Sequence, residues 1–413
     1  ASDVLQSDTV VIGSDGRESG KDFVSALRTG FESEGLSVWY MGTVPTPALA
    51  HAAATYGIAG AMVSASHNPS EDNGIKLLSA GGKKLSDHAQ REIEAILESN
   101  DFPDFTKGAD YVEPSYSHLA NDWVSTLRES IKGRSLSGIS LVVDCANGAV
   151  SAFAANTLRE LGARVVSIHD VPDGTNINED CGSTSLRSLQ TAVRDNNADL
   201  GLAFDGDADR VLAIDKRGRV IDGDFMIAIC AEDMKSRKAL KDNTAVVTVM
   251  TNLGFHLAMK EKGIHVYQTP VGDRQVLAAL EENDWSLGGE QSGHIIFSDL
   301  STTGDGLLTG IQLLDIIARS NKRLDELADF AMVRYPQVLK QVNLSTTTVD
   351  IESLLAEDIA NAEIELGDSG RVLVRRSGTE PVLRIMVESL TDEIAESTVN
   401  KLVLAAESYL AGS

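Results

Sequence analysis

The sequence predicts an α/β protein with three similar α/β domains and a smaller C-terminal α+β domain. Its 413 residues are too many for one ordinary core, because a domain has roughly 150 residues. Three segments also begin alike: a β-branched apolar run is followed by a Gly/Asn loop and then by a helical pattern. These segments are Thr9–Gly20, Ser140–Ser151 and Thr244–Phe255.

The expected order of strands and helices changes after Pro336. This change is the third observation that supports the predicted fold class. The remaining residues read as strand, strand, loop, strand and helix. In the final helix, Thr391 supplies an N-terminal cap and an apolar face follows at helical spacing, formed by Ala395, Val399, Leu402 and Ala406. With polar linkers as boundaries, we expect domains at residues 1–112, 116–217, 218–332 and 336–413.

In the first domain, a short buried strand is expected over Ile58–Val63, directly before the stretch SASHNP. The dipeptides Asn73-Gly74 and Gly81-Gly82 favour tight hairpin turns after it. Ser66 and His67 therefore lie on a loop at the carboxyl end of a strand, where α/β proteins commonly bind ligands. Ser66 is a candidate nucleophile, although a turn that only connects two elements would have a similar composition.

Charge and composition exclude several classes of partner. The formal net charge is −25, and this field repels the phosphates of nucleic acids, so no nucleic-acid partner is expected. A phosphorylated metabolite would be repelled as well, so an anion site needs locally clustered basic residues. The longest apolar stretch is interrupted by Pro47, His51, Tyr56 and Gly57, which argues against a membrane span.

The cysteines indicate the compartment. Cys145, Cys181 and Cys230 are odd in number and widely spaced, which is typical of buried thiols in a reducing environment. We expect a cytoplasmic protein that is a monomer or a homodimer.

The stretch FDGDADRV follows another buried strand and carries Asp205, Asp207 and Asp209 at alternate positions. Three carboxylates at this spacing repel one another unless a cation joins them, and oxygen ligands suit Mg²⁺. The EF-hand alternative fails because Arg210 and Lys216 stand where that motif needs Gly and Glu. A solvated acidic turn stays open as an alternative, but Arg210 would complete a phosphate clamp beside a metal.

Four further stretches carry polar groups suited to an anion or to sugar hydroxyls. In VLVRRSGTEPVLR, two hydroxyls, a glycine and flanking arginines form a candidate anion nest, made of Arg375, Ser377, Gly378, Thr379 and Arg384. In LGGEQSGH, alternate positions hold Glu290, Ser292 and His294, a set suited to sugar hydroxyls. Weaker candidates are Gly272, Asp273 and Arg274 in TPVGDRQV and Arg17 near the first βα turn. Each stretch alone also fits an ordinary polar loop.

Together, the motifs SASHNPSEDNGIK, DGDADR, GGEQSGH and RRSGTEP resemble those of the α-D-phosphohexomutase superfamily over nearly the whole chain. The superfamily has four domains around a central cleft. The stretches NINEDCGST, TPVGDRQV and TTGDGLLTG are most similar to its bacterial phosphoglucosamine mutase branch. The resemblance therefore implies interconversion of glucosamine 6-phosphate and glucosamine 1-phosphate, with glucose or mannose phosphates as the alternative substrates.

The resemblance also implies roles for individual residues. Ser66 would carry a phosphoryl group, pass it to the sugar to give a bisphosphate such as glucosamine 1,6-bisphosphate, and bind Mg²⁺ together with the three aspartates. Lys76 and His294 match positions of proton transfer, and a lysine base would have its pKa lowered by neighbouring cations. Glu290 and Ser292 match the sugar loop, and residues Arg375 to Thr379 match the loop that binds the non-reacting phosphate.

One departure from the superfamily leads to a third hypothesis. Members begin with a segment resembling FGTDGIRG, and no counterpart precedes VVIGSDGRESG in this sequence. We therefore expect an incomplete first domain, and an inactive sugar-phosphate-binding protein stays open beside the two mutase hypotheses.

Overall fold

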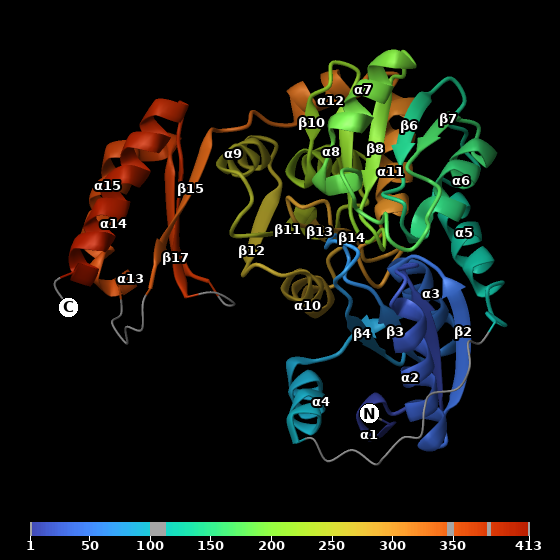
Figure 1. The fold of residues 1–413 in the computed structure, drawn as a ribbon. Helices are drawn as coiled ribbons and strands as arrows, with labels where there is room; N and C mark the ends of the chain where they lie inside the picture. Colours follow the sequence, from blue (N-terminus) through green and yellow to red (C-terminus); the bar gives the residue numbers. More distant parts are fainter. Residues whose placement is uncertain (1, 100–112, 345–350, 378–380, 412–413) are drawn as a thin grey trace. The chain divides into compact units, whose positions relative to one another are not determined.

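The computed structural model describes residues 2–99, 113–344, 351–377 and 381–411 (Figure 1). They form two compact units, one of residues 1–250 with 263–331 and the other of residues 251–262 with 332–413. No helix in these described ranges is long and apolar enough to cross a membrane.

Three sheets in the first unit share one plan. The first strand lies in the middle, the second and third strands pair with it in parallel on either side, and the next strand pairs antiparallel with the third. This plan confirms the mixed-sheet α/β fold class, because one topology recurs where the sequence repeats.

The first sheet has the order β2-β1-β3-β4-β5. Its strands are β1 (Thr9–Ser14), β2 (Ser37–Thr43), β3 (Ala59–Val63), β4 (Ile75–Ser79) and β5 (Lys83–Lys84). Its helices are α1 (Ser2–Leu5), α2 (Gly20–Ser33), α3 (Thr46–Tyr56) and α4 (Asp87–Ser99). A Cβ at Gly13 or Gly60 would lie 2.8 or 2.9 Å from the side chain of Leu49. These two glycines therefore let α3 pack closely against β1 and β3.

The second sheet has the order β10-β9-β8-β6-β7. Its strands are β6 (Ser140–Asp144), β7 (Arg164–Ile168), β8 (Leu200–Phe204), β9 (Val211–Asp215) and β10 (Val220–Ile221). The helices of this region are α5 (Leu119–Glu129), η1 (Ala149–Ala152), α6 (Ala154–Glu160), η2 (Gly182–Thr184) and α7 (Arg187–Asp195). All five residues of β8 are buried, as the sequence predicts for the strand before the acidic turn.

The third sheet has the order β12-β11-β13-β14. Its strands are β11 (Thr244–Thr248), β12 (His265–Thr269), β13 (Leu287–Gly289) and β14 (Ile295–Phe297). The nearby helices of this unit are α8 (Gly223–Ser236), η3 (Lys241–Asn243), α10 (Asp273–Asn283), α11 (Gly306–Ser320) and α12 (Leu324–Ala331).

The second unit contains a three-stranded antiparallel sheet of order β15-β17-β16. Its strands are β15 (Gln337–Asn343), β16 (Arg371–Arg376) and β17 (Val382–Glu388). Its helices are α9 (Leu253–Glu261), α13 (Ile351–Leu354), α14 (Ala356–Leu366), η4 (Gly367–Ser369) and α15 (Asp392–Ala411). The predicted apolar face of α15 is buried in this core at Ala395, Val399, Leu402 and Ala406. Helices α13 and α14, between β15 and β16, are absent from the sequence-based prediction.

Candidate active site

Ser66 lies just after β3, where the chain turns sharply. Its φ is 53°, in the left-handed region that non-glycine residues seldom adopt, and its exposed fraction is 8 %. The Oγ atom donates a hydrogen bond to Asp205 Oδ2 at 2.7 Å and lies 3.4 Å from His67 Nδ1. The hydroxyl of the first predicted loop therefore meets the acidic turn of the second domain.

Arg17 fixes this loop from behind. Its Nη1 atom donates to the carbonyls of Pro69 and Asp72, and its Nη2 atom donates to those of Ser66 and Asn68. The side chain is fully buried. The sequence predicts that Arg17 binds substrate, whereas in this structure its guanidinium donors contact the loop backbone.

Other residues that hold Ser66 in place are missing from the sequence-based prediction. Ser64 Oγ accepts from the backbone N–H of Ser66 at 2.8 Å and donates to Asp15 Oδ2 at 2.7 Å. From the second domain, Asn178 Nδ2 donates to the carbonyls of Ser66 and Asn68, both at 2.9 Å. In the sequence, the only sign of these contacts is that Asp15 lies in the stretch VVIGSDGRESG and Ser64 in the stretch SASHNP.

The three aspartates lie in the turn between β8 and β9 and fit a hard divalent cation. Asp205, Asp207 and Asp209 are buried and place carboxylate oxygens within 4.8 Å of one another. Among the described residues, the Oδ1 atoms of Asp207 and Asp209 are buried without a hydrogen-bond partner. Burial raises the pKa of Asp205 well above its ordinary value, and the charges of Asp209 and Asp207 add to this. Such crowding favours a bound cation.

Lys76, on β4, also contacts these carboxylates. Its Nζ atom lies 2.6 Å from Asp207 Oδ2 and 3.2 Å from Asp209 Oδ2. Burial favours the neutral amine, but the charges of Asp207 and Asp209 outweigh it and raise the Lys76 pKa well above its ordinary value. The sequence-based expectation of a lowered pKa depends on neighbouring cations, whereas the nearest charges to Lys76 among the described residues are carboxylates.

Arg210 and His67 lie beside the same cluster. The Arg210 N–H donates to Asp205 Oδ1 at 3.1 Å, and Arg210 Nη1 lies 3.3 Å from His67 Nδ1. Burial and the Arg210 charge lower the pKa of His67, so this imidazole is neutral at pH 7. Ser66, His67, Lys76 and Arg210 therefore surround one group of carboxylates.

His294, at the end of the turn between β13 and β14, comes from the third domain. It is 1 % exposed, its Nδ1 lies 3.7 Å from Asp209 Oδ1, and its Nε2 lies 3.7 Å from Asp273 Oδ2. The N–H of Gly304 donates to Nε2 at 3.2 Å, so a neutral imidazole carries its proton on Nδ1. The proton then faces Asp209, in the acidic turn.

The other candidate residues of the stretches LGGEQSGH and TPVGDRQV lie in the same region as His294. Glu290 Oε1 accepts from the N–H of Gly272 at 3.0 Å. Asp273 pairs with Lys84 Nζ, and Arg274 donates to Gln90. Ser292 is solvent-exposed. Gly272, Glu290, Asp273 and Arg274 thus use polar atoms to join the first and third domains or to hold the loop, while Ser292 is open to a ligand.

The candidate anion nest belongs to the second unit. Arg375 and Arg384 are register partners on β16 and β17, and burial together with the Arg384 charge lowers the pKa of Arg375. Like charges directly opposite each other destabilise a sheet, so this pair favours a bound anion. Ser377 N–H donates to the carbonyl of Val382 at 2.9 Å, whereas Gly378 and Thr379 lie outside the described residues.

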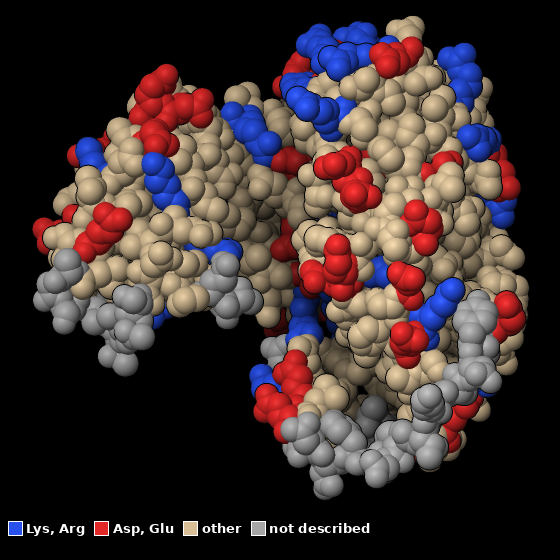
Figure 2. All heavy atoms as spheres, in the orientation of Figure 1, with Lys and Arg blue, Asp and Glu red and all other residues tan. Residues whose placement is uncertain are grey.

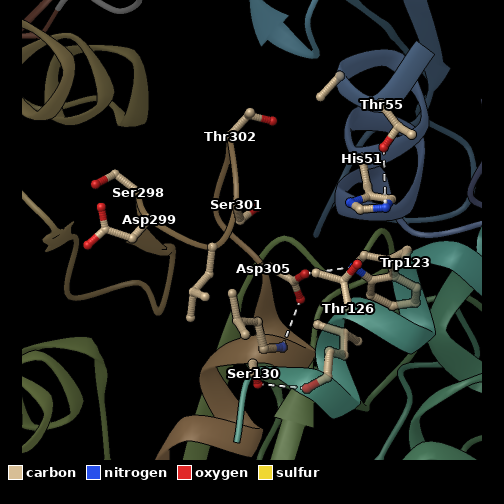
Figure 3. A pocket seen from close by; sticks show the side chains of 14 residues that line it. His51, Thr55, Trp123, Thr126, Ser130, Ser298, Asp299, Ser301, Thr302 and Asp305 are labelled. Carbon is tan, nitrogen blue, oxygen red and sulfur yellow. Dashed lines mark hydrogen bonds between the residues drawn. The ribbon is translucent and has the colours of Figure 1, made fainter. Parts of the chain in front are cut away.

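A pocket of about 380 Å³ lies elsewhere in the first unit, between α3, α5 and the segment before α11 (Figure 3). Its lining includes His51, Thr55, Trp123 and Asp305 and none of the predicted site residues. Asp305 Oδ2 accepts from Trp123 Nε1 at 2.8 Å, and its Oδ1 accepts from the N–H of Leu308 at 2.9 Å. Burial raises the pKa of Asp305 to about 6.

A fold of this kind, with a serine hydroxyl directed at a cluster of three carboxylates that could hold a metal ion, defines a phosphohexomutase. Phosphoglucomutase/phosphomannomutase family profiles match the chain in four parts: the alpha/beta/alpha domains I, II and III and the C-terminal domain, at residues 1–104, 114–218, 222–335 and 320–405 respectively. The chain belongs to this family.

Two relatives named phosphoglucosamine mutase match most of the chain. The phosphoglucosamine mutase of Frankia alni is 47% identical over 407 residues, which cover 97% of this chain and 88% of the relative. That of Corynebacterium glutamicum is 48% identical, with 95% and 88% covered.

Solved structures share the fold. The phosphoglucomutase/phosphomannomutase family protein of Burkholderia thailandensis matches with a TM-score of 0.78 and 26% identity, covering 97% of this chain and 90% of that one. The Aspergillus fumigatus N-acetylphosphoglucosamine mutase, solved with GlcNAc-6P and magnesium, matches with a TM-score of 0.63 and 20% identity, covering 88% and 91%.

Proposed function

We propose that the protein is a phosphoglucosamine mutase that interconverts glucosamine 6-phosphate and glucosamine 1-phosphate through a phosphoserine at Ser66. The observation that carries the proposal is the 2.7 Å hydrogen bond from Ser66 Oγ to Asp205, inside the cluster of three carboxylates. The two phosphoglucosamine mutases compared above, each nearly half identical to this chain, favour the amino sugar as substrate.

The reaction needs two phosphoryl transfers, the first from Ser66 to the sugar and the second from the sugar to Ser66. In the first, the P–Oγ bond of phosphorylated Ser66 breaks while a sugar hydroxyl oxygen bonds to phosphorus and loses its proton to a base. The freed Ser66 Oγ takes up a proton and becomes a hydroxyl, and the product is a sugar bisphosphate. After that sugar turns over, Ser66 Oγ gives up its proton and bonds to the other phosphorus, while the bond from that phosphorus to the sugar oxygen breaks and the sugar oxygen takes up a proton.

The described residues supply the charges for these steps. Asp205, Asp207 and Asp209 would hold Mg²⁺, which neutralises charge on the transferring phosphoryl oxygens when bound. Arg210 adds a second cation beside the cluster. Lys76, whose ammonium contacts Asp207 and Asp209, and His294 are the candidates for moving the sugar proton. A divalent cation would offset the carboxylate charge and so lower the Lys76 pKa toward the range of a base.

The phosphate that does not react also needs a site. Arg375 and Arg384 present two positive charges at one register position of β16 and β17, and Ser377 adds a hydroxyl. We assign this nest to the distal phosphate and the exposed Ser292 to the sugar loop. One nest that accepts either phosphate would let a single serine act at both ends of the sugar.

The test starts from glucosamine 6-phosphate, Mg²⁺ and a trace of glucosamine 1,6-bisphosphate, with glucosamine 1-phosphate measured as product. Ser66→Ala should abolish turnover and the phosphoryl group that intact mass spectrometry detects on the protein. Ser70→Ala, on the same loop, is the matched control and should keep both. Turnover by a folded Ser66→Ala variant would contradict the phosphoserine mechanism. A higher kcat/KM for glucose or mannose phosphates would reassign the substrate.

A further inference from the structure

A second cluster of metal-binding side chains lies at the carboxyl edge of the second sheet. Asp144 is the last residue of β6, His169 directly follows β7, and Cys181 directly precedes η2. Their ligand atoms lie within 4.8 Å of one another. None of these residues belongs to the acidic turn at Asp205 or to the proposed catalytic groups.

Two atoms of this cluster are buried and lack hydrogen bonds within the described part of the chain. They are Asp144 Oδ2 and His169 Nδ1. The Asp144 side chain is completely buried, while its other oxygen, Oδ1, accepts from the N–H of Ala146 at 3.0 Å. His169 Nδ1 lies 3.1 Å from Asp144 Oδ1, and the two groups form an ion pair when the imidazole is protonated. A buried carboxylate oxygen left without a partner is costly.

We propose that Asp144, His169 and Cys181 bind a late first-row divalent metal of the Zn²⁺ class. Thiolate, imidazole and carboxylate together form a typical donor set for this class, whereas Mg²⁺ prefers oxygen alone. Ligands at about 2.0 to 2.3 Å from a tetrahedral metal lie roughly 3.5 Å apart, so small side-chain shifts from the observed spacing suffice. The backbone hydrogen bond to Asp144 Oδ1 fixes the carboxylate, as outer contacts do in metal sites.

The cluster is connected to the loop that carries Ser66. Asn178 lies three residues before Cys181. Its backbone N–H donates to the carbonyl of Ala146, two residues after Asp144, at 3.0 Å. Its side chain donates to the carbonyls of Ser66 and Asn68. A metal bound at Cys181 and Asp144 would therefore stiffen the segment that supports the Ser66 loop, which gives the site a structural role.

The test uses the full chain, stripped with a chelator and then saturated with Mg²⁺ so that the Asp205 cluster is filled. Titration with Co²⁺ should then give one binding event, with a thiolate-to-cobalt band in the near ultraviolet and a higher Tm. Cys181→Ser should lose the band, and His169→Asn should weaken Co²⁺ binding more than about 10-fold. Cys230→Ser removes a buried thiol of α8 and is the matched control, which should retain the band.

Three results would overturn the site. One is titration without a thiolate band, the second is a band that survives in folded Cys181→Ser, and the third is unchanged Co²⁺ affinity in His169→Asn. The His169 variant keeps the test decisive if Cys181→Ser fails to fold, because the His169 side chain is 30 % exposed and its replacement disturbs little packing.

Discussion

At the scale of single residues, Arg17 has the most unexpected position. An arginine beside the serine that we propose to carry the phosphoryl group suggests a contact with phosphate, yet its guanidinium donates to four carbonyls of the Ser66 loop. Under the proposed function we expect Arg17 to be a positioning residue that acts through the placement of Ser66.

We expect Arg17→Lys to lower kcat about 100-fold, since a displacement of about 1 Å has that effect on catalysis, while KM changes little. Steady-state kinetics measure kcat and KM separately, and Arg28→Lys, at a half-buried position of α2, is the control. A large rise in KM with kcat unchanged would instead mean that Arg17 binds substrate.

The raised pKa of Asp305 predicts how the free energy of unfolding depends on pH. Burial raises its pKa from 3.8 to about 6, so between these values the folded protein holds a proton that the unfolded chain has lost. The free energy of unfolding therefore falls as pH rises from about 4 to about 6, by at most about 3 kcal/mol.

Asp305→Asn keeps an acceptor for the Leu308 N–H and removes the titration. Urea unfolding at a series of pH values should show a flatter profile for this variant than for the unchanged chain. Equal slopes for the two proteins would contradict the raised pKa.

The sequence was sufficient to predict the site residues that stand in a short, recognisable motif. Ser66 and the three aspartates stand in short motifs after apolar runs, and strand ends place such residues at one edge of a sheet. The contacts of Arg17 and the raised pKa of Lys76 were not predictable, because both depend on groups about 50 and 130 positions away.

At the scale of elements, the acidic turn between β8 and β9 meets the Ser66 loop closely. A Cβ at Gly206 would lie 2.6 Å from the carbonyl oxygen of Ser66 and 2.8 Å from the side chain of Ile177. We expect Gly206→Ala to push the two loops apart and to lower both Mg²⁺ affinity and kcat.

Isothermal titration with Mg²⁺ and a mutase assay measure these two effects. Gly30→Ala, within α2, meets nothing within 4 Å and is the control; it should stabilise the protein by about 0.5 to 1 kcal/mol. Full activity of Gly206→Ala would show that the close approach does not matter.

The strands of the repeated sheets were predictable because each combines an apolar run with a following turn. Helices α13 and α14 were not, because they are short and their burial depends on tertiary contacts. In this segment Ile351 and Leu355 are buried, but Ile364 is 78 % exposed, so no clear amphipathic period appears. Short helices obtain most of their stability from packing.

At the scale of the whole molecule, the net charge is −25. On the face that Figure 2 shows, Asp and Glu are scattered, while several Lys and Arg gather at the top of the view. The cations that the proposed function assigns to an anionic substrate are placed individually, at Arg210 and Lys76 in one unit and at Arg375 and Arg384 in the other.

The second unit has its own core, built from β15, β17 and α15 around residues such as Leu383 and Val399. Leu383→Ala should destabilise this unit by about 2 to 5 kcal/mol. Calorimetry should then show an earlier transition for the second unit, while the transition that Mg²⁺ shifts stays in place. A single transition that moves as a whole would show that the two units unfold together.

The position of the Lys76 ammonium on Asp207 and Asp209 links two events that are usually treated as separate. A divalent ion that used these Oδ2 atoms would compete with the ammonium for them, so loading the metal would free the amine next to Ser66. If the proposed function holds, magnesium occupancy and the protonation of Lys76 would then be coupled in one equilibrium.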